Sequence, residues 1–198
     1  MNGSRLRLVA GLGNPGENYR HTRHNVGFCV LDRIAASYSI PFTFRERDAV
    51  FGRGAIHGIP VVLAKPMAYM NRSGLPLIRL SEKFGISNRD LVVIHDDLDL
   101  AFGRLKIKEK GGDGGHRGVR SIIDAFGSGE FTRVRVGIGR SETGMAVVDY
   151  VLTEFSPEEA ESLDEVISRT RDAVVTILCK GTKDGMNQFN TKRTEIIS

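Results

Sequence analysis

Short apolar segments of strand length alternate with amphipathic helical segments along most of this chain, and no other feature constrains the fold as strongly. Residues 5–10 alternate basic and apolar side chains and lead into glycines, and residues 91–94 form a continuous apolar run. Strands that alternate with helices predict an α/β sandwich, and short apolar strands between helices favour parallel pairing at the centre of a sheet. We therefore expect one α/β domain over residues 1–198, with a mixed and largely parallel sheet between helices.

Periodicity and turn residues divide the rest of the chain into elements. Apolar segments at residues 50–52 and 59–63 flank His57-Gly58, which predicts two strands joined by a turn. Apolar side chains then recur at helical spacing in four stretches, which begin near Asn25, after Ser73, near His116 and after Ser156. The last stretch opens as a capping box with proline at the first helical position and ends at Gly181. A further strand is predicted over 134–138.

Composition excludes several classes of protein. Of the residues, 40% are hydrophobic and 26% charged, which excludes a mostly disordered or fibrous chain. No apolar run approaches the roughly 20 residues that span a bilayer, and the start does not resemble a signal peptide, so a cytoplasmic protein with no membrane partner is expected. Cys29 and Cys179 lack metal-site spacing and are expected to be reduced thiols on apolar helix faces. The net charge of +4 weakly favours an anionic partner.

The segment Gly11–Gly16 reads Gly-Leu-Gly-Asn-Pro-Gly and matches the dinucleotide-binding pattern GxGxxG. In that pattern the third glycine lies within a helix, whereas Asn-Pro-Gly favours a turn and the next helix begins only near Asn25. The acidic residue expected about 20 positions later at a strand end is also missing. We interpret the segment as a turn that leaves Asn14 at the carboxyl end of a strand, where α/β folds build their sites.

His24 stands just before the first helix, and the buried strand 91–94 leads into His95-Asp96-Asp97. A carboxylate bonded to one ring nitrogen fixes the histidine tautomer and makes the other nitrogen more basic, as a general base requires. A structural histidine is the plain alternative. Spacing alone does not decide whether Asp96, Asp97 or the nearby Asp99 is the partner.

Polar side chains also lie between the strand 59–63 and the helix that follows Ser73. Asn71 could donate its amide to a carbonyl oxygen or hold a water molecule, and Tyr69 could offer a stacking face. A turn with core methionines and an asparagine cap explains the same residues equally well.

The most basic part of the chain is a short segment of alternating character. It places Arg104, Lys106, Lys108 and Lys110 on one face of a predicted strand and apolar side chains on the other. A glycine-rich loop, 111–115, then leads into a helix that starts near His116-Arg117. Glycines, a helix N-terminus and cations together favour a phosphate site, and Arg133 and Arg135 are candidates to extend it. The alternative is a solvated edge strand that lysines protect from aggregation.

Several catalytic patterns are missing from the chain, namely GxxxxGK[ST], HExxH, GxSxG and paired zinc cysteines. The candidate site residues are a histidine, an aspartate and asparagines, and none of them is a typical nucleophile. We therefore expect water to attack the substrate directly, without a metal or other cofactor.

These motifs, taken in order, resemble the bacterial-type peptidyl-tRNA hydrolases. The resemblance runs from Arg5 into the last long helix and is carried by Val9–Gly16, Tyr19, Thr22–Asn25, Met70-Asn71 with Ser73-Gly74, His95-Asp96 and Gly114–His116. It implies a monomeric α/β hydrolase without a cofactor that cleaves the ester between a peptide and the terminal ribose of tRNA. Its partner would be peptidyl-tRNA, held by the acceptor stem and the 3′ end.

The resemblance also assigns roles to individual residues. His24 would be the general base that activates water, Asp96 its orienting partner, Asn71 a substrate-positioning residue and Asn14 the residue that recognises a peptidyl rather than a free aminoacyl group. The substrate-binding and tRNA-binding residues would be Tyr19, Tyr69, His116, Arg117, Lys106, Lys108 and Arg133.

Two positions depart from the family pattern. Tyr69 stands where the family often has phenylalanine, and Arg117 stands where many members have asparagine. Arginine only donates hydrogen bonds and is always charged, so we expect Arg117 to hold a phosphate of the acceptor stem. Relatives that serve as RNA-splicing factors make a non-catalytic RNA-binding module the alternative function, and a nicotinamide-dependent oxidoreductase would rest on GxGxxG alone. The intact His24, Asp96 and Asn71 favour the enzyme.

Overall fold

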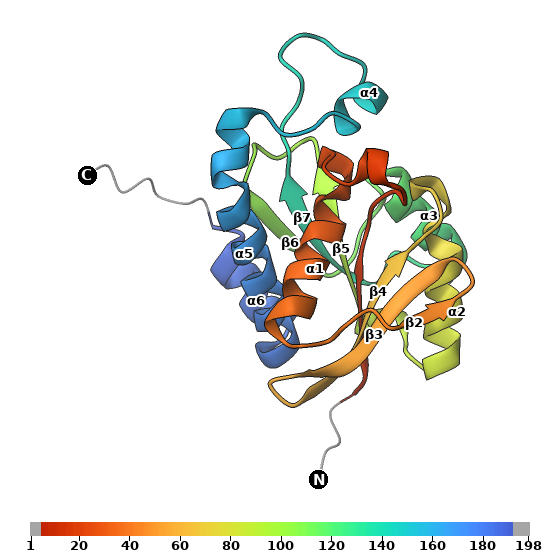
Figure 1. Ribbon diagram of the computed structural model, residues 1–198. Coiled ribbons are helices and arrows are strands. Elements are labelled where there is room, and N and C mark those ends of the chain that lie inside the picture. The colour runs from red at the N-terminus through yellow and green to blue at the C-terminus, as the bar shows by residue number, and fades with distance from the viewer. Residues whose placement is uncertain (1–4, 192–198) are drawn as a thin grey trace.

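A seven-stranded sheet forms the centre of the molecule in the computed structural model, which describes residues 5–191 (Figure 1). Its strands follow the order β2-β3-β4-β1-β5-β7-β6. The strands are β1 (Arg7–Gly11), β2 (Phe44–Glu46), β3 (Ala49–Ile56), β4 (Ile59–Pro66), β5 (Leu91–Asp97), β6 (Leu105–Lys108) and β7 (Thr132–Gly137). The four inner strands β4, β1, β5 and β7 are parallel, and β2, β3 and β6 complete the two edges in antiparallel pairs. The predicted mixed sheet with a parallel centre is confirmed.

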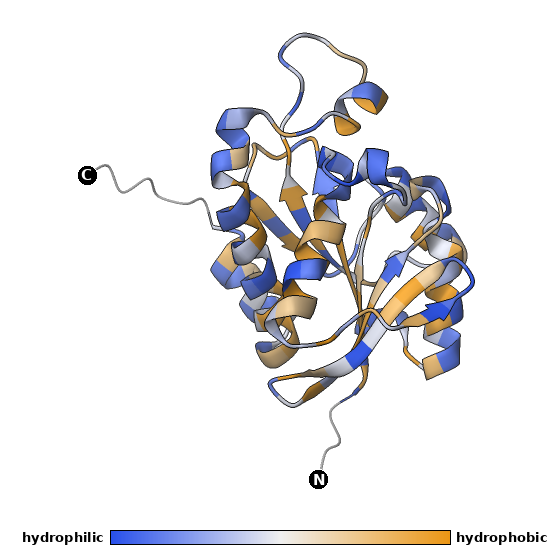
Figure 2. Ribbon diagram, in the orientation of Figure 1, coloured by the Kyte–Doolittle hydropathy of each residue, from blue (hydrophilic) through white to orange (hydrophobic). Residues whose placement is uncertain are grey.

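Helices cover both faces of this sheet. The helices α1 (Val26–Ser37), α5 (Pro157–Lys180) and α6 (Thr182–Phe189) lie on one face, and α2 (Gly74–Phe84) and α3 (Arg117–Phe126) lie on the other (Figure 1). Successive side chains of a strand point to opposite faces, so Val9 enters the core under α1 while Leu8 enters the core under α2 and α3. Figure 2 shows hydrophobic strands enclosed by helices with hydrophilic outer surfaces, as the sandwich prediction requires.

The regular elements predicted from periodicity are all present. The capping box of α5 forms, with the Ser156 hydroxyl accepting from the Glu159 backbone and the Glu159 carboxylate accepting from the Ser156 backbone. Short elements were not predicted, namely β2, α4 (Val147–Val151), α6 and the 3-10 turns η1 (Glu17–Tyr19), η2 (Arg23–Asn25), η3 (Met70–Arg72) and η4 (Asn88–Asp90). A strand of three residues and helices of three to eight residues are too short to show a clear hydrophobic period.

The two cysteines differ in their surroundings. Cys29 and Cys179 are free thiols, and Cys29 packs against the core of its helix face. Cys179 is exposed on α5, so the prediction of an apolar setting is wrong for this residue. Between residues 5 and 191, no helix combines the length and the hydropathy needed to cross a membrane.

A glycine in the first turn of α1 brings that helix directly onto the sheet. A Cβ atom at Gly27 would lie 2.6 Å from the Leu12 amide nitrogen and 2.5 Å from the Ile94 carbonyl oxygen. Both neighbours are backbone atoms, one just after β1 and the other in the middle of β5, so neither can swing away. The absence of a side chain therefore sets the distance between the start of α1 and these two strands, and His24 lies just before that start.

We expect Gly27→Ala to destabilise the fold. Alanine gains up to about 1 kcal/mol over glycine in helix propensity, but forcing a methyl group against immobile backbone costs typically about 1–3 kcal/mol, and more when the neighbours cannot relax. The free energy of unfolding, measured by urea denaturation, should fall by about 1–2 kcal/mol. Gly112→Ala is the matched control, because nothing lies within 4 Å of a Cβ atom there. Equal stability of both variants would contradict this role for Gly27.

Candidate active site

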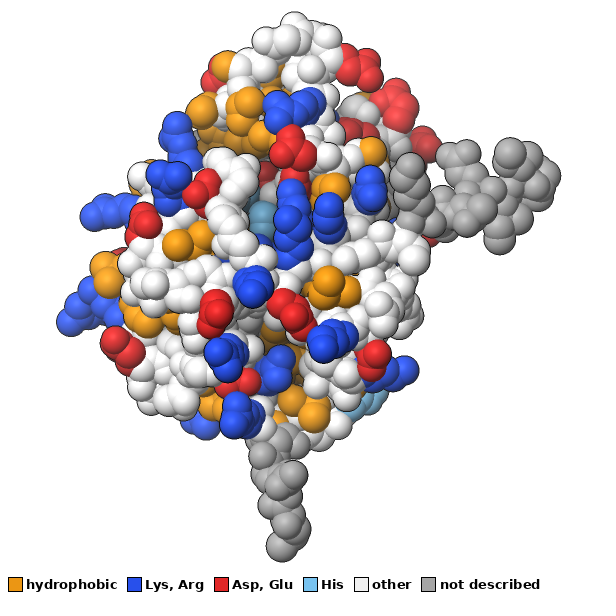
Figure 3. All heavy atoms as spheres, turned by 180° about the vertical axis from the view of Figure 1, so that it is seen from behind, with side chains coloured by type: hydrophobic (Ala, Val, Ile, Leu, Met, Phe, Trp, Pro, Cys, Tyr) orange, Lys and Arg blue, Asp and Glu red, His pale blue; other side chains and the backbone are white. Residues whose placement is uncertain are grey.

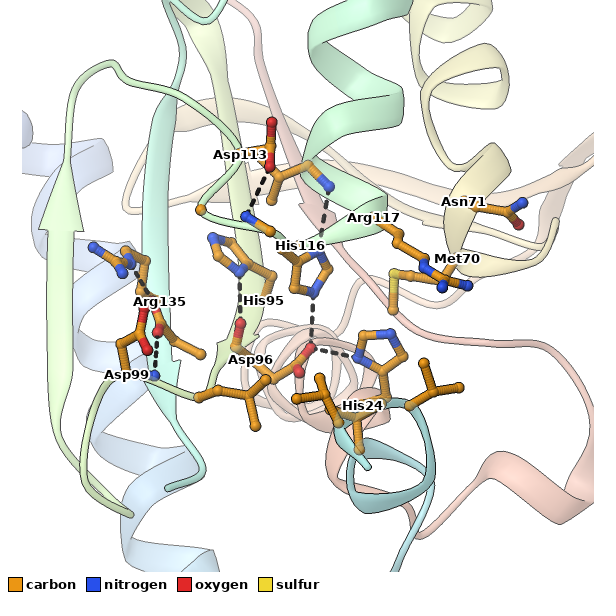
Figure 4. Close-up of a pocket in the computed structure, with 18 of the residues that line it drawn as sticks. His24, Met70, Asn71, His95, Asp96, Asp99, Asp113, His116, Arg117 and Arg135 are labelled. Carbon is orange, nitrogen blue, oxygen red and sulfur yellow. Dashed lines mark hydrogen bonds and ion pairs between the residues drawn. The ribbon is translucent and has the colours of Figure 1, made fainter. Parts of the chain in front are cut away.

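The carboxyl ends of the central strands open into a cavity of about 720 Å³. Its walls come from the loop after β1, from η2 and η3, from the end of β5, from the glycine loop 111–115 and from α4. The elements converge there because parallel strands present their carboxyl ends at one edge of the sheet. Most of the residues predicted to form the site lie in this cavity, and Figure 4 shows how they are arranged.

One buried carboxylate joins two histidines at the floor of the cavity. Asp96, at the end of β5, accepts hydrogen bonds at Oδ1 from His24 Nδ1 at 2.8 Å and from His116 Nε2 at 2.9 Å (Figure 4). Asp96 is 2% exposed, and both rings are mostly shielded from solvent. Of the three aspartates that spacing left open, Asp96 is therefore the partner of His24.

The hydrogen bonds of His116 determine which of its nitrogens carries the proton. His116 is the N-cap of α3, and its Nδ1 accepts from the Val119 amide at 3.2 Å. Its Nε2 must then carry hydrogen and donate to Asp96. With both nitrogens engaged, His116 has no free ring donor or acceptor for the substrate. Its position supports the carboxylate instead of the predicted contact with substrate or tRNA.

The electrostatics of the cluster favour an ionised Asp96. Burial raises the pKa of this carboxyl group, but the His24 and His116 rings and the hydrogen bonds that both donate outweigh burial and lower the pKa below its usual range. His95, the residue before it, is buried, and its Nδ1 donates to the Asp96 backbone carbonyl at 2.7 Å. Burial, reinforced by the adjacent His116, lowers the pKa of the His95 imidazole well below its usual value, so this ring stays neutral.

Asn14 presents a hydrogen-bond donor to the cavity. Its Oδ1 accepts from the Met70 amide at 2.8 Å, so the free part of its side chain is the Nδ2 amide group. Asn25 fixes the backbone of Asn14 from both sides, accepting from its amide at 2.9 Å and donating to its carbonyl at 3.0 Å. Sequence reasoning missed Asn25, although its place in the Thr-Arg-His-Asn motif was visible.

The remaining predicted residues line the rim. The Tyr19 and Tyr69 rings meet edge to face with centroids 6.4 Å apart, and Tyr69 is 59% exposed. Asn71 is exposed on η3, and Figure 4 shows its amide directed away from Asp96 and the two histidines. Asn71 therefore borders the cavity but does not belong to the cluster at its floor.

Cations surround the mouth of the cavity. Figure 3 shows lysine and arginine side chains gathered around a hollow in which a histidine is visible. Lys108 and Arg117 are exposed at the cavity, and Arg117 extends into it beside Met70 (Figure 4). Lys106 is partly buried on β6 and does not line the cavity. Arg135 and Arg140 also border it, paired with Asp97 and Asp99.

Arg133 has a different environment from the one predicted. It is 2% exposed, and its guanidinium group donates to the carbonyls of Gly111, Gly129 and Phe131. Burial, with a smaller contribution from Arg135, lowers the pKa of Arg133 to about 10. A guanidinium committed to three carbonyls cannot readily grip an RNA phosphate. Arg133 instead fastens the glycine loop to the sheet, so its position argues against the predicted tRNA contact.

The same cluster has the composition of a metal site. His24, Asp96 and His116 are the one group within residues 5–191 whose ligand atoms lie close enough to share an ion. Asp96 Oδ1 already accepts the N–H hydrogens of both rings, so an ion would have to displace two protons. The hydrogen bonds explain the arrangement without a metal.

A histidine that a buried carboxylate orients towards a cavity can activate water, as an α/β hydrolase requires. The sequence model of peptidyl-tRNA hydrolase matches residues 8–196, and the chain belongs to the peptidyl-tRNA hydrolase family.

Relatives of known name and structure cover nearly the whole chain. The peptidyl-tRNA hydrolase of Bacillus subtilis is 45% identical over 94% of this chain and 100% of its own length. That of Geobacter sulfurreducens is 46% identical over 94% of this chain and 96% of its own. The crystal structure of peptidyl-tRNA hydrolase from Acinetobacter baumannii superposes with a TM-score of 0.88 at 35% identity, over 96% of this chain and 97% of that one.

The lowered pKa of Asp96 predicts a pH-dependent contribution to stability. A carboxyl group whose pKa is lower in the folded than in the unfolded state stabilises the fold above its unfolded pKa of about 3.9, and this stabilisation is lost as the pH falls further. The advantage of the parent over Asp96→Asn should therefore shrink below about pH 4, by at most about 1.4 kcal/mol per pH unit. Urea denaturation between pH 3 and 7 measures it.

The matched control for this experiment is Asp164→Asn, which removes an exposed carboxylate paired with Arg33. Its effect on stability should be small at every pH, because exposed ion pairs contribute little. A constant difference between the parent and Asp96→Asn across the pH range would contradict the assignment.

Proposed function

We propose that this protein hydrolyses peptidyl-tRNA, cleaving the ester between the peptide and the terminal ribose and so recycling tRNA from peptides released early from ribosomes. The observation that carries the proposal is the His24–Asp96 pair, in which Asp96 takes Nδ1 and leaves Nε2 directed into the cavity (Figure 4). The activity that family membership implies needs such a base, because the site offers no nucleophile of its own.

His24 acts as the general base. The neutral imidazole accepts a proton at Nε2 from water while the water oxygen attacks the ester carbonyl, and the tetrahedral intermediate then expels the ribose oxygen, which takes up the proton. Asp96 holds the ring in the tautomer with hydrogen on Nδ1 and stabilises the transient imidazolium. His116, which donates to the same carboxylate oxygen, keeps that oxygen in place.

Two asparagines position the substrate. The Nδ2 group of Asn14 donates to a carbonyl of the peptide, a group that a free aminoacyl ester lacks at that position, and so favours peptidyl substrates. Its geometry suits this role because Oδ1 and the backbone are held by Met70 and Asn25. The exposed Asn71 reaches the ester region when its side chain turns inward from the rim.

The cationic rim and the tyrosines hold the acceptor stem and the 3′ end of the tRNA. Lys108 and Arg117 offer charge to phosphates, with Lys106 further along the same strand, and Tyr19 and Tyr69 offer faces on which bases stack. We propose that the enzyme works as a monomer, without a metal or other cofactor, in the cytoplasm where tRNA is used. A non-catalytic RNA-binding module would need the rim but not the buried His24–Asp96 pair.

His24→Ala should abolish hydrolysis, because it removes the oriented base, and burial holds the pKa of the neighbouring His95 too low for that ring to replace it. The assay is the release of a labelled N-acetyl-aminoacyl group from tRNA, with and without EDTA, beside the unacetylated aminoacyl-tRNA. The parent should cleave only the acetylated substrate, and EDTA should leave the rate unchanged. Asp96→Asn should retain more activity than His24→Ala. Binding of tRNA without cleavage by the parent would favour the RNA-binding module.

Lys108→Gln should weaken tRNA binding without changing the chemical step. Removing one cation from a phosphate lowers the salt dependence of binding, by about 0.7–0.9 in the slope of log K against log salt concentration. Binding titrations from 50 to about 200 mM salt measure this slope. Lys180→Gln, an exposed position at the end of α5, serves as the control and should leave the slope unchanged. Equal slopes for the parent and Lys108→Gln would exclude a phosphate interaction at this lysine.

A further inference from the structure

Arg23 is a buried arginine beside His24 that no step of the proposed reaction uses. It is 6% exposed and precedes His24 in η2. We propose that Arg23, through its ion pair with Glu159, is a positioning residue that holds the α4 segment (residues 139–155) against the catalytic histidine. The consequence for substrate binding rests on the proposed function, whereas the consequence for the position of the α4 segment does not.

The guanidinium group of Arg23 makes a bidentate ion pair at the start of α5. Its NH1 donates to Glu159 Oε1 at 2.8 Å and its NH2 donates to Glu159 Oε2 at 2.6 Å. Burial raises the pKa of Glu159, but the bonds from Arg23 and from the Ser156 backbone outweigh it and lower the pKa, so the pair is fully charged. A forked, partly buried pair of this kind is stronger and more directional than an exposed one.

Arg23 also contacts both ends of the α4 segment. Before the segment, its NH1 lies 3.4 Å from the Ile138 carbonyl. After α4, its backbone amide donates to the Thr153 carbonyl at 2.9 Å and its Nε to the Thr153 hydroxyl at 3.2 Å. The faces of Tyr150 and Phe155 lie 4.5 Å and 5.1 Å from the guanidinium carbon. Arg23 thus contacts the residues at both ends of the segment.

The Tyr150 hydroxyl closes the same junction, donating to the Ile138 carbonyl at 2.9 Å. Outside this junction the segment is held by the ion pair between Arg140 and Asp99 and by hydrogen bonds among its own residues, and Figure 1 shows it projecting beyond the sheet as a loop that carries α4. Its position relative to His24 therefore depends on the contacts at its base, and Arg23 supplies the largest share of them.

The α4 segment contributes an apolar wall to the cavity. Val147, Val148, Val151 and Leu152 line the cavity together with His24. Val147 and Val148 are about half exposed, at 49% and 48%, and exposed apolar patches commonly mark sites of ligand or partner binding. Arg140, the one cation of this segment, is paired with Asp99, and the unpaired Lys108 and Arg117 come from other elements, so this wall suits the peptide part of the substrate. Loosening it should weaken substrate binding while the His24–Asp96 geometry, and with it the chemical step, is retained.

Glu159→Gln tests the proposal with the smallest change of side-chain shape. Glutamine is isosteric and still accepts from the Ser156 amide, so the capping box of α5 survives while the ion pair is lost. We expect KM for N-acetyl-aminoacyl-tRNA to rise about fivefold or more with kcat within about twofold of the parent, the signature of weakened binding with intact chemistry. Arg23→Lys keeps the positive charge but cannot form the bidentate pair with Glu159, so it should raise KM by less than Glu159→Gln does.

A second measurement reports on the segment without any activity. Arg140 is the only trypsin site within residues 139–155 and its side chain is 63% exposed. Cleavage after Arg140, followed by mass spectrometry of the fragment ending there, should be several-fold faster in Glu159→Gln than in the parent, because cleavage follows the population of locally opened molecules.

Arg33→Gln is the matched control. Arg33 joins α1 to α5 through Asp164 and Ser168, away from the α4 segment. It should leave KM and the cleavage rate unchanged. The proposal is overturned if trypsin cleaves Glu159→Gln after Arg140 at the same rate as the parent. It is also overturned if Arg33→Gln has the same effect as Glu159→Gln. A parent without hydrolytic activity would refute the proposed function, and the cleavage rates alone would then decide the role of Arg23.

Discussion

The site depends on one oxygen atom, Asp96 Oδ1, which accepts hydrogen bonds from two histidines at once. A carboxylate that is 2% exposed keeps its charge only if strong donors replace the water it has lost. His24 and His116 are those donors, and they come from helical elements on opposite faces of the sheet. Asp96 therefore couples three features of the site. They are the orientation of the proposed base His24, the ionisation of Asp96 itself and the N-cap of α3.

Close backbone packing brings these elements together. The start of α1 lies directly against the middle of β5 and the residue after β1 because Gly27 has no side chain. The start of α3 packs against side chains instead, since a Cβ atom at Gly118 would lie 2.5 Å from Met70 Sδ and 2.9 Å from Leu12 Cδ1. Backbone contact therefore sets the position of α1, whereas α3 rests on two side chains that can shift. His24, in η2 just before α1, and His116, the N-cap of α3, thus come within hydrogen-bond distance of Asp96.

Sequence reasoning reached the parts of this arrangement that depend on local pattern, such as the strand whose end carries Asp96. Which aspartate meets His24 followed from resemblance, because that choice depends on how η2 packs against the end of β5. Local pattern also cannot show that Arg133 is buried, since Arg135 lies on the same face of β7 and stays partly exposed. Asn25 was missed because its partner lies 11 residues away, a contact that exists only in the folded chain. The helix α4 was missed because five residues are too few to show a hydrophobic period, and its three valines line the cavity.

The charges around the cavity divide into two groups with different uses. Arg135 and Arg140 are paired with aspartates, so their charge is largely neutralised within the protein. Lys108 and Arg117 have no acidic partner within 4 Å among residues 5–191, and both are exposed at the cavity. A phosphate can bind an unpaired cation without breaking an ion pair inside the protein. Binding to Lys108 and Arg117 therefore has a smaller free-energy cost than binding to Arg135 and Arg140. The arginine at position 117, where many family members have asparagine, therefore adds charge at the point where the cavity is open to an anionic substrate.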